Sequence, residues 1–203
     1  GATGHQEAAR SRGRHLATVG SIEARTRAAA SRSPAAAQPG GASVPVAARA
    51  AGRAHVLACC TEYRQETAIL QRSARRNGFK FHAVGIGEPW GGFSTKFLAY
   101  HRMLRELIGK KMSPDDTVVL MDAWDTVILG TVDELLEKIA EMPRDSVLCG
   151  AERVCGPNHF LVGQMEQLYP DVHTPWRYPN SGGIVASAET MERLLHGLVH
   201  DTE

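Results

Sequence analysis

Residues 117–125 read Thr-Val-Val-Leu-Met-Asp-Ala-Trp-Asp, and this stretch decides the fold class. The run Thr117–Met121 follows a turn and predicts a buried strand, because short apolar runs bounded by turn residues are typical of strands covered on both faces. Asp122 and Asp125 come directly after it. In open α/β sheets, ligands bind beyond the carboxyl ends of the strands. The two carboxylates are therefore expected at the edge of the sheet where a ligand would bind.

The segments on either side alternate between strand patterns and helix patterns. Strands are expected at 55–60, 79–84, 146–150 and 182–185, and helices at 65–77, 94–108, 131–142 and 188–199. In the first helix Ala68, Ile69 and Arg72 follow helical spacing. In the second, one face carries Phe97, Tyr100, His101, Leu104, Leu107 and Ile108. This alternation predicts an α/β fold with a mostly parallel sheet flanked by helices.

The first quarter of the chain differs in composition from the rest. Residues 1–53 hold 16 Ala, 8 Arg and 2 Glu and no aromatic residue. Residues 54–203 hold all 12 aromatic residues, with 15 basic and 20 acidic side chains. Because the Ala/Arg-rich leader has too little apolar surface to offset the entropy of ordering its backbone, it is expected to be a disordered basic leader, such as a linker or part of a transit or pro-segment. The 150 residues that follow are enough for a sizeable core.

Composition also argues against several kinds of partner. No apolar run reaches the roughly 18–20 residues of a membrane span. The arginines of the leader are scattered among alanines without aromatic residues for base stacking, so a nucleic-acid partner is not expected.

The four cysteines lack CxxC and zinc-ribbon spacing, and those in apolar runs are expected to be buried free thiols: Cys59, Cys60 and Cys149. Three histidines lack metal-ligand spacing and are interpreted as structural: His101, His159 and His173.

Asp122 and Asp125 are the candidate metal ligands. Hard divalent cations prefer oxygen ligands, and two carboxylates three positions apart on a turning backbone can converge on one ion. Such an ion neutralises charge on a leaving phosphate. The alternative, that Asp122 caps the next element and Asp125 is solvated, stays open. Phosphatases with a D-x-D-x-[TV] motif need a spacing of two, and the Gly85–Trp90 loop lacks the third glycine of G-x-G-x-x-G, so both of these chemistries are disfavoured.

A series of short motifs completes this picture from about His55 to Val199. They are Cys60-Thr61-Glu62, Gly87–Gly92 (GEPWGG), Lys96, Leu120–Val127 (LMDAWDTV), Val132–Leu136 (VDELL), Ala151-Glu152, Tyr169–Val172 (YPDV) and Asn180–Gly183 (NSGG). In this order and at these intervals they resemble the glycosyltransferase domain of the multifunctional procollagen lysyl hydroxylases, within the collagen-modifying glycosyltransferases. The resemblance implies a GT-A-like α/β domain over residues 54–203, a UDP-sugar donor and a Mn²⁺ cofactor.

The resemblance also implies roles for individual residues. Asp122 and Asp125 match the aspartates that hold Mn²⁺ and the donor diphosphate, so Asp122 belongs to both sites. Cys59 and Thr61 match the strand edge that meets the uridine. Trp90 and Lys96 match further positions of the donor site. A segment near the sugar and the acceptor is matched by Asn180, Ser181, Gly182 and Gly183. No catalytic residue is assigned.

The chain departs from the family pattern in two places. The family's Cys-Trp-Pro is Cys155-Gly156-Pro157 here, which removes an aromatic side chain near the site. The family also has an acidic Asp-Asp-Gln segment and a metal-binding histidine after the Asn-Ser-Gly-Gly segment, and these are expected past Glu203. The domain is therefore expected to be incomplete at its C-terminus, and residues 1–203 to transfer sugar poorly by themselves. A hydroxylase domain is not expected within this sequence, since it lacks a His-x-Asp…His iron-binding pattern.

The function predicted from these observations is metal-dependent transfer of a hexose from UDP-glucose or UDP-galactose to a hydroxyl acceptor, with a hydroxylysine of a collagen-like chain as the implied acceptor. The resemblance places such a protein in the secretory pathway, in the lumen of the endoplasmic reticulum. Two alternatives stay open. One is a non-catalytic module that binds nucleotide sugars. The other is a different nucleotide-handling α/β enzyme, although Cys60–Tyr63 does not supply the Gly-rich basic loop that a nucleotidyltransferase would need.

Overall fold

The structure is a computed structural model that describes residues 53–172 and 174–200. The strands are β1 (Ala54–Cys59), β2 (Lys80–Val84), β3 (Thr117–Asp122), β4 (Leu148–Glu152) and β5 (Tyr178–Ser187). The helices are α3 (Gln65–Arg76), α4 (Phe93–Leu107), α5 (Val132–Ala140), α6 (Val162–Leu168) and α7 (Ala188–His200), with a 3₁₀ turn η1 (His159–Leu161) before α6. The leader predicted over residues 1–53 lies outside the described residues, except for Arg53, and so does His173.

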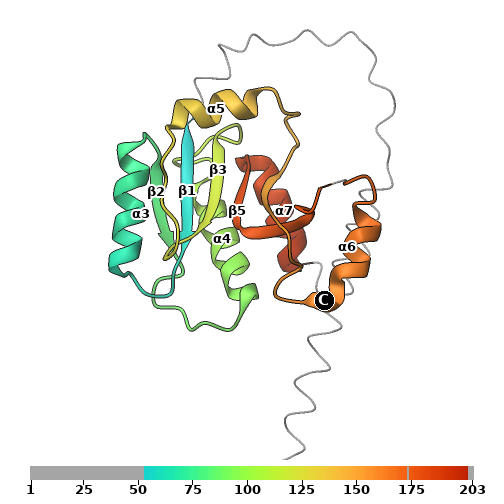
Figure 1. The fold of residues 1–203 in the computed structure, drawn as a ribbon. Coiled ribbons are helices and arrows are strands. Elements are labelled where there is room, and N and C mark those ends of the chain that lie inside the picture. Colours follow the sequence, from blue (N-terminus) through green and yellow to red (C-terminus); the bar gives the residue numbers. More distant parts are fainter. Residues whose placement is uncertain (1–52, 173, 201–203) are drawn as a thin grey trace, which may run out of the picture.

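The five strands form one sheet in the order β2-β1-β3-β5-β4 (Figure 1). β1 pairs in parallel with β2 and β3, whereas β5 runs antiparallel to both of its neighbours, β3 and β4. Among the strands of residues 53–172 and 174–200, four therefore run in one direction and only β5 is reversed. The predicted α/β fold with a mostly parallel sheet flanked by helices is confirmed.

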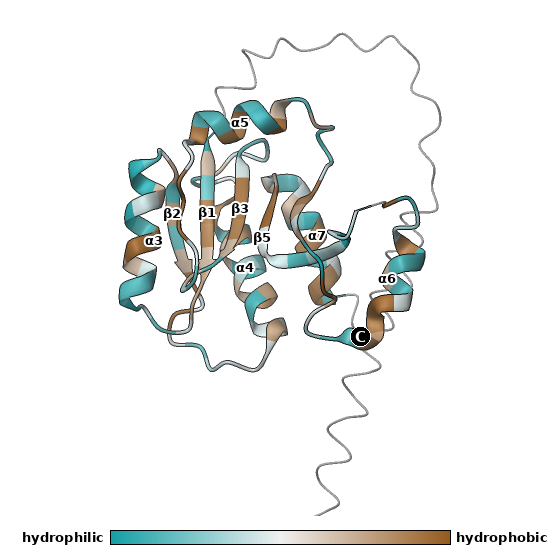
Figure 2. Cartoon of the chain, in the orientation of Figure 1, coloured by the Kyte–Doolittle hydropathy of each residue, from teal (hydrophilic) through white to brown (hydrophobic). Residues whose placement is uncertain are grey.

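The strands of the sheet bury side chains on both faces. Along β1, Leu57 packs with residues of α4 and α7, whereas Val56 and Ala58 face the clusters that contain residues of α3. This alternation follows the two-residue period of a strand. Figure 2 shows the hydrophobic residues gathered along the central strands and the polar residues on the outer faces of the helices. The predicted strand at residues 117–121 is thus a central, buried strand.

Several elements differ from their predicted bounds or faces. The strand expected at 146–150 is β4, two residues later, and the one expected at 182–185 is the ten-residue β5. In α3 the buried residues are Thr67, Leu70 and Ala74, while Ile69 is 42% exposed, so the spacing chosen from the sequence marks the wrong face of that helix. The α6 helix was not predicted, because its seven residues include none that the structure buries.

β4 explains one wrong prediction about the cysteines. All four are free, and Cys60 and Cys155 are buried, but Cys149 is exposed rather than buried. Cys149 lies on β4, which is at the edge of the sheet and exposes four of its five residues. An apolar run alone cannot separate an edge strand from a central one, because the difference depends on which neighbours cover it.

The long helix has the predicted face. Its buried residues include Tyr100, His101, Leu104 and Leu107, and it ends at Leu107, with Ile108 in an extended conformation. The Tyr100 hydroxyl donates a hydrogen bond of 2.7 Å to the main-chain oxygen of Met121, which joins α4 to the end of β3. No helix in the described ranges, 53–172 and 174–200, is long and apolar enough to cross a membrane.

A histidine pair marks the start of β1. The His55 ring stacks on His82 with 5.3 Å between centroids, and its Nε2 lies 3.3 Å from Oδ2 of Asp116. Burial is the main cause that lowers the pKa of both imidazoles. The second cause is the charge of Lys80 for the pKa of His55, and the charge of His55 for the pKa of His82. For His82 the pKa falls from 6.5 to about 4. Both rings are therefore neutral in the folded chain at pH 7.

The first prediction concerns acid unfolding. The unfolded chain binds a proton at His82 near pH 6.5, and the folded chain binds it only near pH 4, so the free energy of unfolding should fall as the pH falls through this window. Urea unfolding between pH 7 and pH 4 measures the slope. His82→Gln should flatten it, whereas His159→Gln, which changes an exposed histidine, should not. The same slope in wild type and His82→Gln would contradict the prediction.

Candidate functional site

The candidate site lies at the edge of the sheet where β1 and β3 end. In the parallel pairing of these strands Cys59 is the partner of Asp122, and on its other side Cys59 pairs with Val84 of β2. The strand run at 117–121 therefore delivers Asp122 to the carboxyl edge of the sheet, as the sequence predicted. The Asp122 side chain is 42% exposed, so one side of the carboxylate faces solvent.

Lys96 is buried against this carboxylate. Its side chain is 4% exposed, and its ammonium donates hydrogen bonds of 2.5 Å to Oδ1 of Asp122 and of 2.9 Å to the main-chain oxygen of Ser181. Because a buried charge is costly unless it is paired and hydrogen-bonded, these two acceptors explain how a lysine can occupy the first turn of α4 facing inward. The contact joins α4, β3 and β5 at one point. The predicted role of Lys96 toward a phosphate stays a prediction, and its partners here are a carboxylate and a carbonyl.

The acceptor-side segment Asn180–Gly183 forms part of β5 beside the same carboxylate. The Asn180 side chain accepts a hydrogen bond of 2.5 Å from the Gly182 amide and donates one to Glu152 of β4. A Cβ atom at Gly182 would lie 2.7 Å from Oδ1 of Asn180 and 3.0 Å from Oδ2 of Asp122. Only a residue without a side chain allows this close approach. At Gly183, in contrast, a Cβ atom would meet nothing within 4 Å.

Asp125 is exposed in the bend that follows β3. The bend is held by a hydrogen bond from the Thr126 hydroxyl to the main-chain oxygen of Asp122, and by Trp124, whose ring centroid lies 4.1 Å from the Arg64 guanidinium carbon. Carboxylate oxygens open to solvent on one side suit a hard divalent cation, so Asp122 and Asp125 fit Mn²⁺ by donor type. Within the described ranges, no third histidine, cysteine or carboxylate joins these two in a metal-binding group.

The predicted uridine-side residues lie where the chain leaves β1. Burial, followed by the neighbouring Cys60, raises the pKa of the Cys59 thiol to about 11, so this cysteine is protonated and a poor nucleophile at neutral pH. The main-chain oxygen of Thr61 accepts a hydrogen bond of 2.8 Å from the Gly87 amide, which draws the loop between β2 and α4 toward the end of β1. At the end of β1, the position of the neighbouring loop is therefore fixed by the Thr61–Gly87 backbone hydrogen bond and not by the Cys59 thiol.

Trp90 lies on that loop with its ring 56% exposed. It packs edge-on against Phe93, with 6.2 Å between ring centroids. In the described part of the chain it takes no part in the hydrogen bonds around Asp122. The structure thus joins Lys96, Asp122 and the Asn180–Gly183 segment directly, and leaves Trp90 as an exposed ring on a neighbouring loop.

Two features of the site were missed from the sequence. Glu152 accepts the hydrogen bond from Asn180, and the Arg64 guanidinium lies over Trp124. Ala151-Glu152 was one of the motifs of the resemblance, but no role and no partner followed for Glu152. The Arg64 contact links residues sixty positions apart, so no local pattern carries it.

A surface hollow of about 530 Å³ borders the acceptor-side segment. It begins at Tyr178, two residues before Asn180 on β5, and at Arg153, which follows Glu152 of β4. Its lining residues are Arg153, Glu166, Pro170, Val172, Thr174, Pro175, Arg177 and Tyr178. The hollow is therefore lined by residues that are close in sequence to Glu152 and Asn180, but not by these two residues themselves.

Comparison with known proteins identifies the family. The family profile described as "PLOD GT domain" matches residues 51–203, which is three quarters of the chain. The chain belongs to this glycosyltransferase-domain family. As a PLOD glycosyltransferase domain it has the fold and the motif order that the resemblance implied.

Curated relatives of this PLOD domain are much longer proteins. The chain is 31% identical over 142 residues to a procollagen-lysine,2-oxoglutarate 5-dioxygenase of Drosophila melanogaster, covering 64% of this chain and 18% of that protein. It is 30% identical over 129 residues to the human multifunctional procollagen lysine hydroxylase and glycosyltransferase LH3, covering 61% and 17%. It is 29% identical over 144 residues to human procollagen-lysine,2-oxoglutarate 5-dioxygenase 1, and the match covers 69% of this chain and 19% of that protein. The chain spans about a fifth of the length of these relatives.

The second prediction uses the two adjacent glycines of the site. Gly182→Ala should lower the free energy of unfolding by about 1–3 kcal/mol, the usual cost of overpacking, because Asn180 and Asp122 must move out of the way of the new methyl group. Gly183→Ala is the matched control, since its methyl group enters open space. Urea unfolding of the three proteins measures the difference. Equal losses in both variants would contradict the close packing of Gly182 on Asp122.

Proposed function

We propose that this chain transfers a hexose from a UDP-sugar to a hydroxyl acceptor with the help of a divalent metal ion. Membership in the PLOD glycosyltransferase-domain family supports the reaction class. The observation that carries the proposal is the Asp122 carboxylate, half-exposed at the carboxyl edge of the sheet and held by the buried ammonium of Lys96. Sites in α/β sheets form at this edge.

Asp122 and Asp125 would hold Mn²⁺, which when bound neutralises charge on the leaving diphosphate. The chain's own residues prepare this site. Lys96 fixes the direction of the Asp122 carboxylate through Oδ1, and its positive charge offsets part of the negative charge that two aspartates and a diphosphate bring together. Gly182 lies against Oδ2, so the backbone of β5 limits where that oxygen can turn.

The UDP-sugar would extend from the end of β1 toward β5. In this arrangement Cys59 and Thr61 form the strand edge beside the uridine, and the exposed ring of Trp90 offers a flat apolar surface to the nucleotide. The sugar would then lie beside the Asn180–Gly183 segment. This order follows the sheet edge from β1 across β3 to β5.

The acceptor we propose is a hydroxylysine of a collagen-like chain. The support is the names of the relatives, which describe procollagen lysine modification, and human LH3 is named as a glycosyltransferase as well as a hydroxylase. The hollow lined by Tyr178 and Arg153 is a surface that could receive a peptide close in sequence to the sugar segment. A procollagen acceptor would place the chain in the secretory pathway.

The third prediction tests the metal and donor site. UDP with Mn²⁺ should raise the melting temperature, because a ligand that binds only the folded chain stabilises it by about 2.7 kcal/mol at a hundredfold excess over Kd. Asp122→Asn and Asp125→Asn should lose most of this shift. Glu137→Gln, which removes an exposed carboxylate on α5, is the control and should keep it. Equal shifts in wild type and both aspartate variants would exclude the assignment.

The fourth prediction tests turnover. With Mn²⁺, release of UDP from UDP-glucose or UDP-galactose should show only a small increase when a peptide containing hydroxylysine or galactosyl-hydroxylysine is added, because poor transfer is expected of this chain. Asp122→Asn should abolish that increase. The same peptide with lysine in place of hydroxylysine is the control for acceptor chemistry. A chain that binds UDP and Mn²⁺ but releases no UDP with any acceptor would instead be the non-catalytic nucleotide-sugar-binding module.

A further inference from the structure

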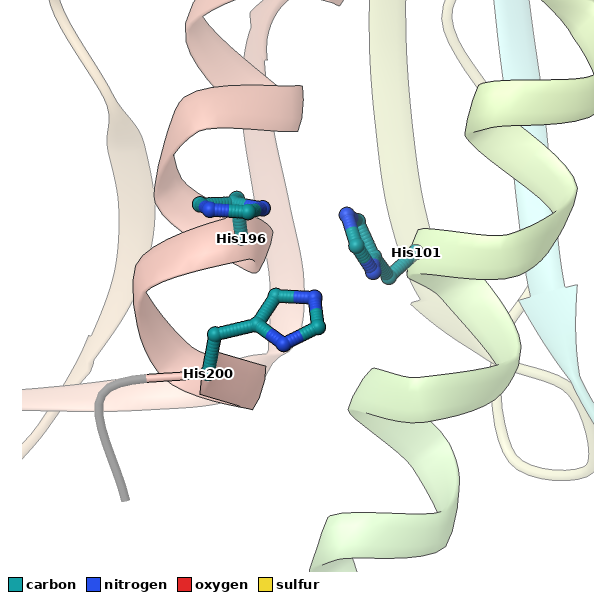
Figure 3. A group of neighbouring side chains, drawn as sticks. All are labelled: His101, His196 and His200. Atoms are coloured by element: carbon teal, nitrogen blue, oxygen red, sulfur yellow. The ribbon is translucent and has the colours of Figure 1, made fainter. Parts of the chain in front are cut away.

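Three histidines from two helices meet on the face of the sheet covered by α4 and α7. Figure 3 shows His101 of α4 turned toward His196 and His200 of α7. One ring nitrogen of each lies within 4.8 Å of the others, and the His101 ring centroid is 5.8 Å and 5.5 Å from the other two. The interpretation of His101 as a structural residue without metal-ligand partners was wrong about the partners, because they lie on a helix distant in sequence.

The arrangement follows from helical spacing on α7. Glu192, His196 and His200 are four residues apart, so they form one stripe along the helix. The neighbouring stripe includes Leu195, which is fully buried in the core cluster shared with α4. Packing of that stripe therefore brings the histidine stripe beside His101.

The buried histidine of the group lacks a good partner. Among the described residues the Nε2 atom of His101 is buried without a hydrogen bond, and Oε1 of Glu192 lies 3.5 Å from it. That distance is longer than the usual 2.7–3.2 Å, so the contact is weak. Buried polar atoms are normally satisfied, and an exception calls for an explanation such as an ion.

We propose that His101, His196 and His200 bind a zinc ion that joins α4 to α7. Imidazole nitrogens favour zinc over Mn²⁺ and Mg²⁺, which prefer oxygen, and two histidines four residues apart on a helix can share one zinc ion. Zinc–nitrogen bonds of 2.0–2.1 Å place tetrahedral ligands about 3.4 Å apart, so the rings must close by little more than 1 Å. His196 and His200 are exposed and have room for this adjustment.

This zinc site differs from the aspartate site in its residues and in its donor atoms, but it acts on the same framework. α4 carries Lys96 in its first turn, and α7 follows directly from β5, which carries Ser181. Because α7 follows β5, linking α4 to α7 also supports the position of α4 relative to β5, the two elements that the Lys96–Ser181 hydrogen bond joins. The zinc is a structural ion in this assignment and does not depend on the proposed transfer reaction.

The fifth prediction uses the full chain without a histidine tag, treated with EDTA and then dialysed. Titration with Zn²⁺ in a calorimeter should give one tight site, and Zn²⁺ alone should raise the melting temperature more than the same concentration of Mn²⁺. His196→Ala and His200→Ala, which change exposed side chains and should fold, are each expected to weaken Zn²⁺ binding at least tenfold. His159→Ala, at another exposed histidine, and Asp122→Asn are the controls and should bind Zn²⁺ like wild type.

The outcomes separate this site from the aspartate site and from an exposed histidine elsewhere on the chain. Loss of the tight site in both α7 variants, with both controls unchanged, supports the assignment. Full Zn²⁺ binding by the double variant His196→Ala/His200→Ala would overturn it, as would loss of binding in Asp122→Asn alone. A melting-temperature increase that is equal for Zn²⁺ and Mn²⁺ and is kept in the double variant would overturn it as well.

Discussion

The ammonium group of Lys96 lies 2.5 Å from the Asp122 carboxylate and 2.9 Å from the Ser181 carbonyl, and the rest of the candidate site depends on this contact. A lysine side chain that is 4% exposed cannot keep its charge without acceptors, because burying an unpaired charge costs several kcal/mol. The first turn of α4, the end of β3 and the middle of β5 must therefore meet at one point. The orientation of the Asp122 carboxylate is in turn limited by Lys96, which binds Oδ1, and by Gly182, which lies close to Oδ2.

The reversed strand makes this convergence possible. β5 lies between β3 and β4 and runs antiparallel to both, so the Asn180–Gly183 segment passes beside the end of β3 and also contacts Glu152 at the end of β4. A parallel β5 would bring its own carboxyl end to this edge instead. The same strand leads directly into α7, which packs on α4 in the largest core cluster. Lys96 and His101 are thus both carried by α4, while the Asn180–Gly183 segment and the other two histidines are carried by β5 and the helix that follows it.

Much of the site could be predicted from local sequence. The apolar run before Asp122 predicted a buried strand, and the alternation of strands and helices predicted that its carboxyl end would carry the site. Lys96 and Asn180–Gly183 were chosen by resemblance, and the structure places Lys96, Ser181 and Gly182 against Asp122. The burial of Lys96, the exposure of Cys149 and the contact of Glu152 with Asn180 could not be read from the sequence. Each depends on which strand lies beside which, and that choice is made by the whole sheet.

The sequence by itself determined the α/β class, the central strand at 117–121 and the position of the two aspartates after it, because these depend on residues close together in the chain. Only the tertiary structure decided the direction of β5, the partners of Lys96 and the meeting of His101 with His196 and His200. These features join residues far apart in sequence. Hydrophobic periodicity sets which face of an element is buried, but it carries no information about the element that covers that face. Packing of the two helices on a shared core supplies that information here.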